Sequence, residues 1–293
     1  MAAEKSSAYG GYYINLDRSV ARRERMEAQL AALDLSSRYA RFAAVDGAAV
    51  HRPGSALRPG ELGAFLSHKS ALETARAKGA AAHILEDDAL LSAHAVPVIE
   101  EAVAGGLFEQ YDVVFTDALI APHLGMLKGL KAIFDKTPPA RERALHLAEL
   151  QAIDLAHQNF SCMTSYVVGA HAIDRVLALY RSQIENGPSK PVDLFMREMV
   201  QTMRLRAALL FPFVTSFRLE EIAASTIAGT PQTPPSVMVL AVLRYLFFVE
   251  RDLGLAKSCL DAVTQKPSRA RDSHHEMIVQ ALDFVLSDAF EEF

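Results

Sequence analysis

The 293-residue chain has only two cysteines, Cys162 and Cys259, and it has no excess of positive charge. Two cysteines cannot form the disulfide framework of a small secreted domain, so we expect a reducing compartment. A formal net charge of −5 argues against a protein that neutralises nucleic-acid phosphates. Residues 1–9 lack the apolar segment of a signal peptide. We therefore expect a cytoplasmic protein with no nucleic-acid partner.

Long apolar runs are also missing. The longest, Val237 to Val249, is interrupted by Arg244 and is too short to cross a bilayer as a helix. Its aromatic residues fit core packing, but they also fit a homodimer interface or a peripheral contact with the inner membrane surface, and these alternatives stay open: Tyr245, Phe247 and Phe248. A hydrophobic content of 51% with 22% charged residues indicates a folded globular protein.

The chain alternates between short apolar runs and helical patterns up to about residue 220. Apolar runs of strand length occur at 12–16, 42–45, 81–85, 111–115 and 165–168. Apolar residues recur with helical spacing at 19–33, 62–72, 96–103 and 172–180. This alternation is typical of an α/β domain whose strands form a parallel sheet.

Two parts of the chain depart from this alternation. Between about 119 and 158, prolines and glycines interrupt the pattern, and we expect an acceptor-binding insertion or a mobile loop there. From Pro235 onward the pattern is helical, including 237–253 and 275–286. The expected organisation is a flexible tail, an α/β domain and a C-terminal helical extension, over residues 1–9, 10–232 and 233–293.

Three adjacent carboxylates, Glu86, Asp87 and Asp88, follow the apolar run 81–85. Ligands of open α/β sheets bind at the carboxyl ends of strands. A divalent cation would remove the repulsion among three like charges, because carboxylate oxygens suit Mg²⁺ or Mn²⁺. Alternate side chains of an extended segment point the same way, so Glu86 and Asp88 should share a face and hold the metal. The alternatives are a metal-free acidic site and a solvated acidic turn.

Several short motifs occur in order around this triplet. They are YINLDRS (13–19), RFAAVDG (41–47), GELG (60–63), SH (67–68), LEDD (85–88), SYVV (165–168), PVD (191–193) and STI (225–227). Over residues 11–228 the set resembles glycosyltransferase family 25, which includes lipopolysaccharide and collagen galactosyltransferases. The resemblance implies a GT-A-type, Rossmann-like nucleotide-sugar-binding domain. It also implies inverting transfer from a UDP-sugar, most often UDP-galactose, to an oligosaccharide or other glycan acceptor.

The resemblance also implies roles for individual residues. Contacts to the nucleotide-sugar donor are implied for Asn15, Asp17, Arg18, Arg22, Asp46, Ser67, His68 and Asp87. Each type of residue also has an ordinary structural explanation. Asp17 and Arg18 can be exposed residues at a helix start, Arg22 a surface charge, and His68 a buried polar group with satisfied hydrogen bonds.

An inverting transfer needs a base that takes the proton of the acceptor hydroxyl. Asp193 is the first candidate, although it can equally cap the helix that follows it. Asp117, which lies just after the predicted strand 111–115, is the second candidate.

The expected function is thus a Mn²⁺- or Mg²⁺-dependent inverting glycosyltransferase of surface-glycan biosynthesis. The helical extension is expected to lie outside the nucleotide site. The alternative is a non-catalytic relative, in which the α/β domain is a binding scaffold and the helical extension contacts a partner.

Overall fold

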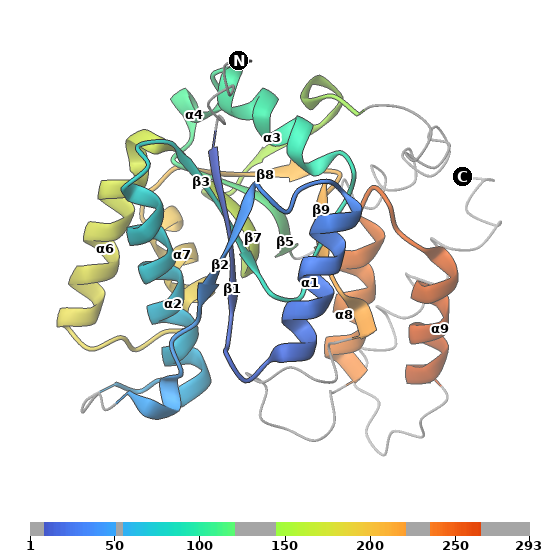
Figure 1. Cartoon of the computed structure of the whole chain (residues 1–293), viewed down its shortest axis with the longest axis horizontal. Helices are drawn as coiled ribbons and strands as arrows, with labels where there is room; N and C mark the ends of the chain where they lie inside the picture. Colours follow the sequence, from blue (N-terminus) through green and yellow to red (C-terminus); the bar gives the residue numbers. More distant parts are fainter. Residues whose placement is uncertain (1–8, 51–54, 121–144, 221–234, 265–293) are drawn as a thin grey trace.

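A seven-stranded mixed sheet forms the centre of the computed structural model, which describes residues 9–50, 55–120, 145–220 and 235–264 (Figure 1). The strand order is β2-β1-β3-β7-β5-β8-β6. These strands are β1 (Tyr9–Asn15), β2 (Tyr39–Ala43), β3 (Ala81–Glu86), β5 (Val113–Ile120), β6 (Gln151–Asp154), β7 (Phe160–Val168) and β8 (Ala207–Phe211). Two short strands, β4 (Ala89–Leu91) and β9 (Thr215–Phe217), pair in a second sheet. The expected Rossmann-like α/β architecture is confirmed.

The sheet is mixed and not wholly parallel. Strands β1, β2, β3, β5 and β8 run in one direction, whereas β7 and β6 run against it. The expectation of a parallel sheet was therefore wrong for β3, which pairs parallel with β1 but antiparallel with β7. As a result, the first residues of β7 lie at the same edge of the sheet as the carboxyl ends of β3 and β5.

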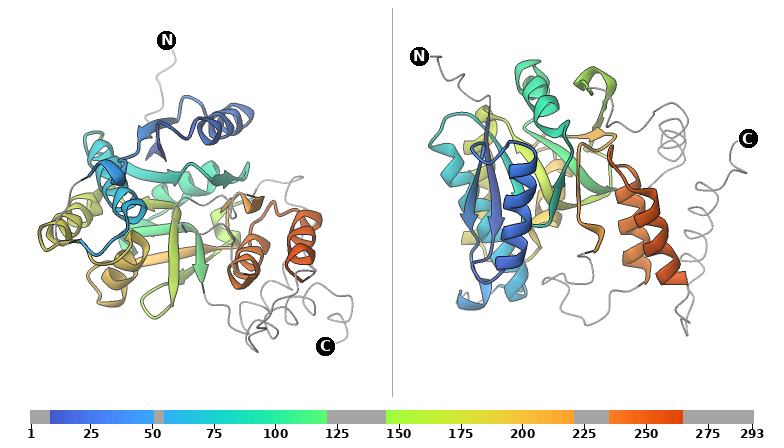
Figure 2. Two further views of the ribbon diagram at one scale, coloured as in Figure 1. Left: turned by 90° about the horizontal axis from the view of Figure 1, so that it is seen from below. Right: turned by 45° about the vertical axis from the view of Figure 1, so that its right-hand side comes forward.

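Five of the helices pack in two groups beside the sheet. Helices α2, α6 and α7 contact one another and lie on the left in Figure 1, while α8 and α9 lie side by side on the right, as Figure 2 also shows. The helices are α1 (Val20–Ala32), α2 (Pro59–Arg76), α3 (Ala95–Ala104), α4 (Leu107–Gln110), α6 (Ile173–Glu185), α7 (Val192–Gln201), α8 (Pro235–Leu246) and α9 (Leu253–Thr264), with short 3₁₀ turns η1 (Gly47–Ala49), η3 (Leu147–Glu149) and η4 (Ala170–Ala172).

Helix α2 lies unusually close to the segment that follows β2. A Cβ atom on Gly47 would lie 1.8 Å from the carbonyl oxygen of Pro59, and one on Gly63 would lie 2.7 Å from that of Val45. Only glycine fits at either position, because real Cβ atoms do not approach backbone so closely. The two motif glycines thus fix α2, and the histidine it carries, at the carboxyl edge of the sheet.

A chain of hydrogen-bonded side chains runs through the core of the sheet. Nδ1 of His83 lies 2.7 Å from Tyr39 Oη, and its Nε2 lies 2.9 Å from Ser165 Oγ. Ser165 Oγ lies 2.6 Å from Thr116 Oγ1, which lies 2.8 Å from Thr215 Oγ1. Burial lowers the pKa of His83 to about 3, so its ring is neutral at neutral pH. In order, the members are Tyr9, Tyr39, His83, Ser165, Thr116 and Thr215.

Two features of the structure bear on the expected division into tail, α/β domain and helical extension, which stays a prediction. Tyr9, expected at the end of a loose tail, is buried and begins β1. The helix expected over 237–253 is divided, because α8 ends at Leu246 and α9 begins at Leu253. Inward-facing side chains of residues 241–249 belong to the same core as the sheet, so position 232 does not separate two cores. The helix expected over 275–286 lies outside the described residues.

The aromatic residues of the C-terminal helices are core residues. Tyr245, Phe247 and Phe248 are all buried, and the ring of Phe247 packs edge-on against Phe211 and Phe213, with centroids 5.2 and 5.5 Å apart. The interpretation as core packing is therefore confirmed for these three rings. Buried rings cannot contact a membrane surface or a second copy of the chain.

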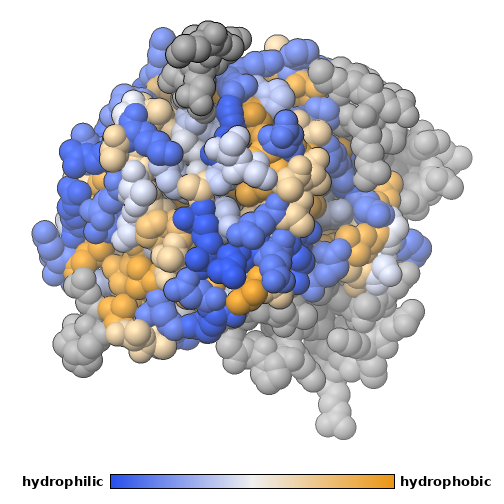
Figure 3. All heavy atoms as spheres, in the orientation of Figure 1, coloured by the Kyte–Doolittle hydropathy of each residue, from blue (hydrophilic) through white to orange (hydrophobic). Residues whose placement is uncertain are grey.

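The described surface shows few large apolar side chains. On the face shown in Figure 3, apolar residues form small areas divided by polar ones. Within the described segments the large exposed apolar side chains are Val20 at the start of α1, Met203 in the turn after α7, and Leu253 at the start of α9. None of the helices in that part of the chain is long and apolar enough to cross a membrane. Peripheral membrane contact and homodimer formation stay predictions.

Candidate functional site

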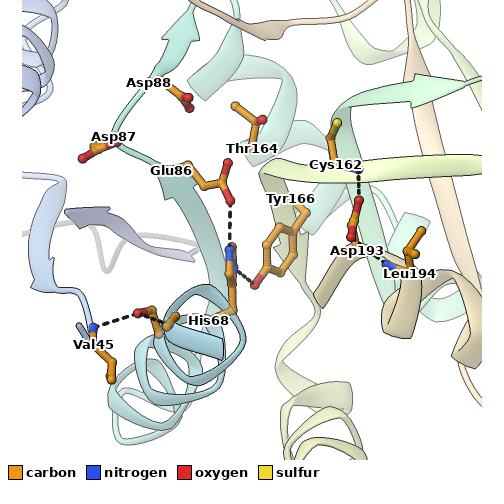
Figure 4. A network of polar contacts seen from close by, with 12 residues as sticks. Val45, His68, Glu86, Asp87, Asp88, Cys162, Thr164, Tyr166, Asp193 and Leu194 are labelled. Atoms are coloured by element: carbon orange, nitrogen blue, oxygen red, sulfur yellow. Dashed lines mark hydrogen bonds and ion pairs between the residues drawn. The ribbon is translucent and has the colours of Figure 1, made fainter. Parts of the chain in front are cut away.

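The acidic triplet lies at the carboxyl end of β3. Glu86 is the last residue of the strand, and Asp87 and Asp88 form the turn that leads into β4. In Figure 4 the carboxylates of Glu86 and Asp88 point to one side, and that of Asp87 points to the other. This is the alternation that extended backbone geometry predicts. The two sides have different neighbours and therefore different chemistry.

Asp87 is held by side chains from β1 and α1. Its Oδ2 accepts a hydrogen bond from Asn15 Nδ2 at 2.7 Å, and its Oδ1 accepts one from Arg22 Nη1 at 3.0 Å. Burial raises the pKa of Asp87, against the opposing effects of Asn15 and Arg22. Arg41 donates through Nε to Asn15 Oδ1 at 3.0 Å. The structure thus brings three of the residues predicted to contact the donor together and adds Arg41 behind them.

The other predicted donor residues near this edge form ion pairs at the surface. Arg18 pairs with Asp46, and Asp17 pairs with Arg41. A hydrogen bond from the Ala48 amide at 3.1 Å, together with Arg18, lowers the pKa of Asp46. Exposed ion pairs contribute little to stability. A ligand can therefore replace them without disturbing the fold.

Ser67 and His68 are both buried but act differently. Ser67 Oγ donates to the Gly63 carbonyl at 2.6 Å and accepts from the Val45 amide at 2.8 Å, so it joins α2 to the segment after β2. His68 lies at the acidic triplet: its Nε2 is 3.2 Å from Glu86 Oε1, and its Nδ1 is 3.0 Å from Tyr166 Oη (Figure 4). Of these two predicted residues, only His68 contacts a triplet carboxylate.

His68 sets the orientation and the ionisation of Glu86. Burial opposes ionisation of this carboxyl, but the hydrogen bond from His68 and the charges of His68, Arg244 and Arg22 bring its pKa below the ordinary value. Glu86 is therefore an anion held in one direction.

Asp88 lacks a comparable partner. Its Oδ1 is buried and accepts no hydrogen bond within the described structure, and Arg22 Nη1 lies 3.7 Å from its Oδ2. Burial and the negative charges of Glu86 and Asp87 raise the pKa of Asp88 to about 7. A buried anionic oxygen without a donor is unfavourable. A cation bound at Asp88 would remove this cost.

The carboxylates fit one kind of metal site and not another. No group of three or more His, Cys, Asp or Glu side chains in the described segments is arranged to hold a metal ion, as a closed zinc site requires. Mg²⁺, by contrast, is commonly held by one or two carboxylates, with substrate phosphates and water completing its coordination. Glu86 and Asp88 fit the second kind, and the buried Oδ1 of Asp88 supports that assignment.

Strand β7 and helix α7 position Asp193. Cys162 has a φ of +77°, which is unusual for a residue other than glycine, where the pairing of β5 and β7 is irregular. Its amide donates to Asp193 Oδ2 at 3.2 Å, and the Leu194 amide donates to Oδ1 at 2.8 Å (Figure 4). The helix cap is Pro191, so Asp193 lies in the first turn of α7. Its carboxylate is held in place by two backbone donors.

Asp117, the second candidate base, is fully buried and paired with Arg244 of α8. Arg244 donates from Nε to Asp117 Oδ1 at 2.7 Å and from Nη2 to Oδ2, and Nη2 also donates to Thr164 Oγ1 at 2.9 Å. Both oxygens of Asp117 are occupied by a cation, which favours Asp193 over Asp117 as the base. The helical extension, expected to lie outside the nucleotide site, thus contributes one side chain, Arg244, that contacts a candidate base.

A hollow of about 680 Å³ lies at the other end of the sheet. Its lining includes Ala81, at the start of β3, and Gly169, just after β7, so the length of β3 separates it from Glu86. Arg206 at its edge and Arg175 nearby pair with the buried Asp112. We place the functional site at the carboxylate end because polar side chains from several elements converge there.

The sequence matches the family model for glycosyltransferase family 25 (LPS biosynthesis protein) over residues 10–196. No curated protein matches the chain. The matched part runs from β1 into α7 and includes the acidic triplet and Asp193. It ends before α8, and the STI motif at 225–227 lies both beyond it and outside the described residues.

Proposed function

The chain belongs to glycosyltransferase family 25, and on that premise we propose that it transfers a sugar from a UDP-sugar to a saccharide hydroxyl. Galactose is the first candidate sugar, and lipopolysaccharide or another surface glycan is the proposed product. The transfer inverts the anomeric centre and uses Mn²⁺ or Mg²⁺ on a GT-A-type domain. One observation carries this proposal: Asp88, at the carboxyl end of β3, has a buried carboxylate oxygen without a donor in the described structure.

The cation would be held by Glu86 and Asp88, where it would offset the negative charge that develops on the departing diphosphate. His68 keeps Glu86 ionised and oriented through the contact of 3.2 Å. Arg22, which lies 3.0 Å from Asp87 and 3.7 Å from Asp88, adds a positive charge on the side of β1 and α1. Asn15 and Asp87 would bind the nucleotide on that side.

Asp193 is the proposed base. The acceptor oxygen forms a bond to the anomeric carbon while the bond from that carbon to the diphosphate breaks, and the hydroxyl proton passes to the Asp193 carboxylate. The amides of Cys162 and Leu194 hold this carboxylate, so it needs no rearrangement to accept the proton. The proposed nucleotide contacts, Asn15 and Arg22, lie on the Asp87 side of the triplet, whereas Asp193 lies on α7.

A screen of UDP-sugars for hydrolysis tests the proposal. We expect the protein to release UDP from one UDP-sugar in Mn²⁺ or Mg²⁺, to release none in EDTA, and to react faster with a suitable saccharide acceptor. Asp174→Asn, which alters an exposed carboxylate on α6 paired with Arg76, is the control and should behave like the wild type. The non-catalytic alternative predicts no release, and no rise in melting temperature when UDP and Mn²⁺ are added.

A further inference from the structure

Arg244 reaches the site from α8, beyond the family-matched span. The residue is only 7% exposed. Besides its bonds to Asp117 and Thr164, its guanidinium carbon lies 4.4 Å from the centroid of the Phe217 ring. Three contacts from β5, β7 and β9 thus fix the position of this cation.

Within the described residues, the contacts of Arg244 leave the Nη1 group of its guanidinium available. Nε and Nη2 make the hydrogen bonds to Asp117 and Thr164, while Nη1 donates to none of the described residues. Both hydrogens of Nη2 are used, so the available donors are the two N–H groups of Nη1, which can donate to phosphate oxygens. Arg244 is therefore a nearly buried cation whose Nη1 group can donate hydrogen bonds to an anionic ligand.

The guanidinium of Arg244 lies next to the proposed metal site. Thr164, which accepts from Arg244 Nη2, lies beside the carboxylates of Glu86 and Asp88 in Figure 4. The charge of Arg244 helps to lower the pKa of Glu86 and opposes the rise in the pKa of Asp88. The positive charge of Arg244 therefore acts at the position where the leaving diphosphate would lie.

The charge balance of the site makes each cation important. Two guanidinium groups, those of Arg22 and Arg244, interact with a larger number of carboxylates: Glu86, Asp87, Asp88 and Asp117. Even with a divalent cation in place, a diphosphate would meet a surplus of negative charge without these arginines.

We propose that Arg244 is a diphosphate-binding residue of the donor site, so that α8 completes a site whose other residues lie within 10–196. The inference rests on the proposed UDP-sugar donor. Asp117 and Thr164 are then positioning residues, because they hold the guanidinium through Nε and Nη2 and not through Nη1. A role limited to packing α8 on β5 would make the same ion pair but would have no preference for ligands that carry phosphate.

UDP and uridine distinguish the two roles, because they differ only in the diphosphate. Their affinities in Mn²⁺, measured by calorimetry, should be compared for the wild type, Arg244→Gln, and Asp117→Asn/Arg244→Gln. The double variant removes the pair without leaving a buried charge alone, so its melting temperature should stay near that of the wild type. We expect UDP to bind about 10- to 100-fold more weakly to both variants and uridine to bind unchanged.

Arg175→Gln is the matched control, since Arg175 also pairs with a buried aspartate, Asp112, but near the other end of the sheet. It should leave both affinities unchanged. If Arg244→Gln does not fold, Arg244→Lys keeps a positive charge at Asp117 and should weaken UDP binding several-fold, because the single ammonium group of lysine cannot hold Asp117 and also donate from the position of Nη1.

Wild-type UDP affinity in a folded variant, or an equal loss of UDP and uridine affinity, overturns the role of Arg244. A wild-type protein that binds no UDP in Mn²⁺ is a different result, because it refutes the proposed donor itself.

Discussion

Asp87 and Asp88 are neighbours in the chain, yet their carboxylates differ in what they can still bind. Asn15 and Arg22 donate to the two oxygens of Asp87, whereas Oδ1 of Asp88 is buried with no donor in the described structure. Asp87 is consequently a fixed part of the protein's own hydrogen-bond network. Asp88 is the carboxylate that can take a new positive ligand.

Replacing Asp88 with asparagine should remove activity and leave the fold intact. Asp88→Asn keeps the shape of the side chain but loses the charge that would hold the cation, so we expect turnover to fall about 10²- to 10³-fold. The melting temperature in EDTA should stay the same or rise slightly, because repulsion from Glu86 and Asp87 is relieved. Unchanged activity together with unchanged enhancement of UDP binding by Mn²⁺ would show that the triplet is not the metal site.

Asp88 should contribute less to the stability of the metal-free protein as the pH rises from about 4 to 7. The pKa of Asp88 is raised from 3.8 to about 7, so in this window the folded protein binds more protons at Asp88 than the unfolded chain does. The free energy of unfolding in EDTA, measured by chemical denaturation, should therefore fall relative to that of Asp88→Asn between pH 5.5 and pH 7.5. His83, whose pKa is lowered to about 3, acts in the opposite direction over part of this range but is common to both proteins. Asp88→Asn should lack this part of the pH dependence, so the two proteins should differ in slope; parallel profiles would contradict the assignment.

Removing His68 should weaken cation binding through Glu86. His68→Asn takes away the partner 3.2 Å from Glu86 Oε1, and such supporting groups commonly contribute about 10- to 100-fold to metal affinity. Mn²⁺ affinity can be measured in the presence of UDP. Tyr166→Phe, which removes only the contact at His68 Nδ1, should have a smaller effect. Equal effects of the two substitutions would argue against orientation of Glu86 by His68.

Asp193→Asn should separate transfer from donor binding. Loss of the base should reduce sugar transfer about 10²- to 10⁴-fold, while UDP affinity in Mn²⁺ stays at the wild-type value. The amide side chain can still accept a hydrogen bond from the backbone, so the fold should persist. Asp117→Asn is the comparison, because it breaks the ion pair with Arg244 and should lower the melting temperature. If Asp193→Asn transfers sugar at the wild-type rate, Asp193 is not the base.

Local patterns predicted the parts of the site that lie within one element. The apolar run before Glu86 and the helical spacing around His68 indicate which face of each element is buried. The common direction of Glu86 and Asp88 followed from strand geometry. Strands β4, β6 and β9 have only three or four residues, too few to show a period. Strand β8 is uniformly apolar and cannot be distinguished from part of a buried helix by its period.

Contacts between distant elements could not be predicted. Asp117 and Arg244 are 127 positions apart, and only the packing of α8 decides that they meet. The direction of β7 is likewise a property of the sheet, since an apolar run does not record whether its neighbour is parallel or antiparallel. The positive φ of Cys162, on which the position of Asp193 depends, has no local sequence signal.

The side-chain hydrogen bonds from Tyr39 to Thr215 have a polarity. A neutral imidazole has one N–H and one acceptor nitrogen. If Tyr39 donates to His83 Nδ1, then Nε2 donates to Ser165, Ser165 to Thr116 and Thr116 to Thr215; if Nδ1 carries the proton, every donor points the other way. The tautomer of one histidine therefore sets the orientation of hydroxyl groups on four other strands, and the core of this sheet has two proton arrangements, each complete from end to end.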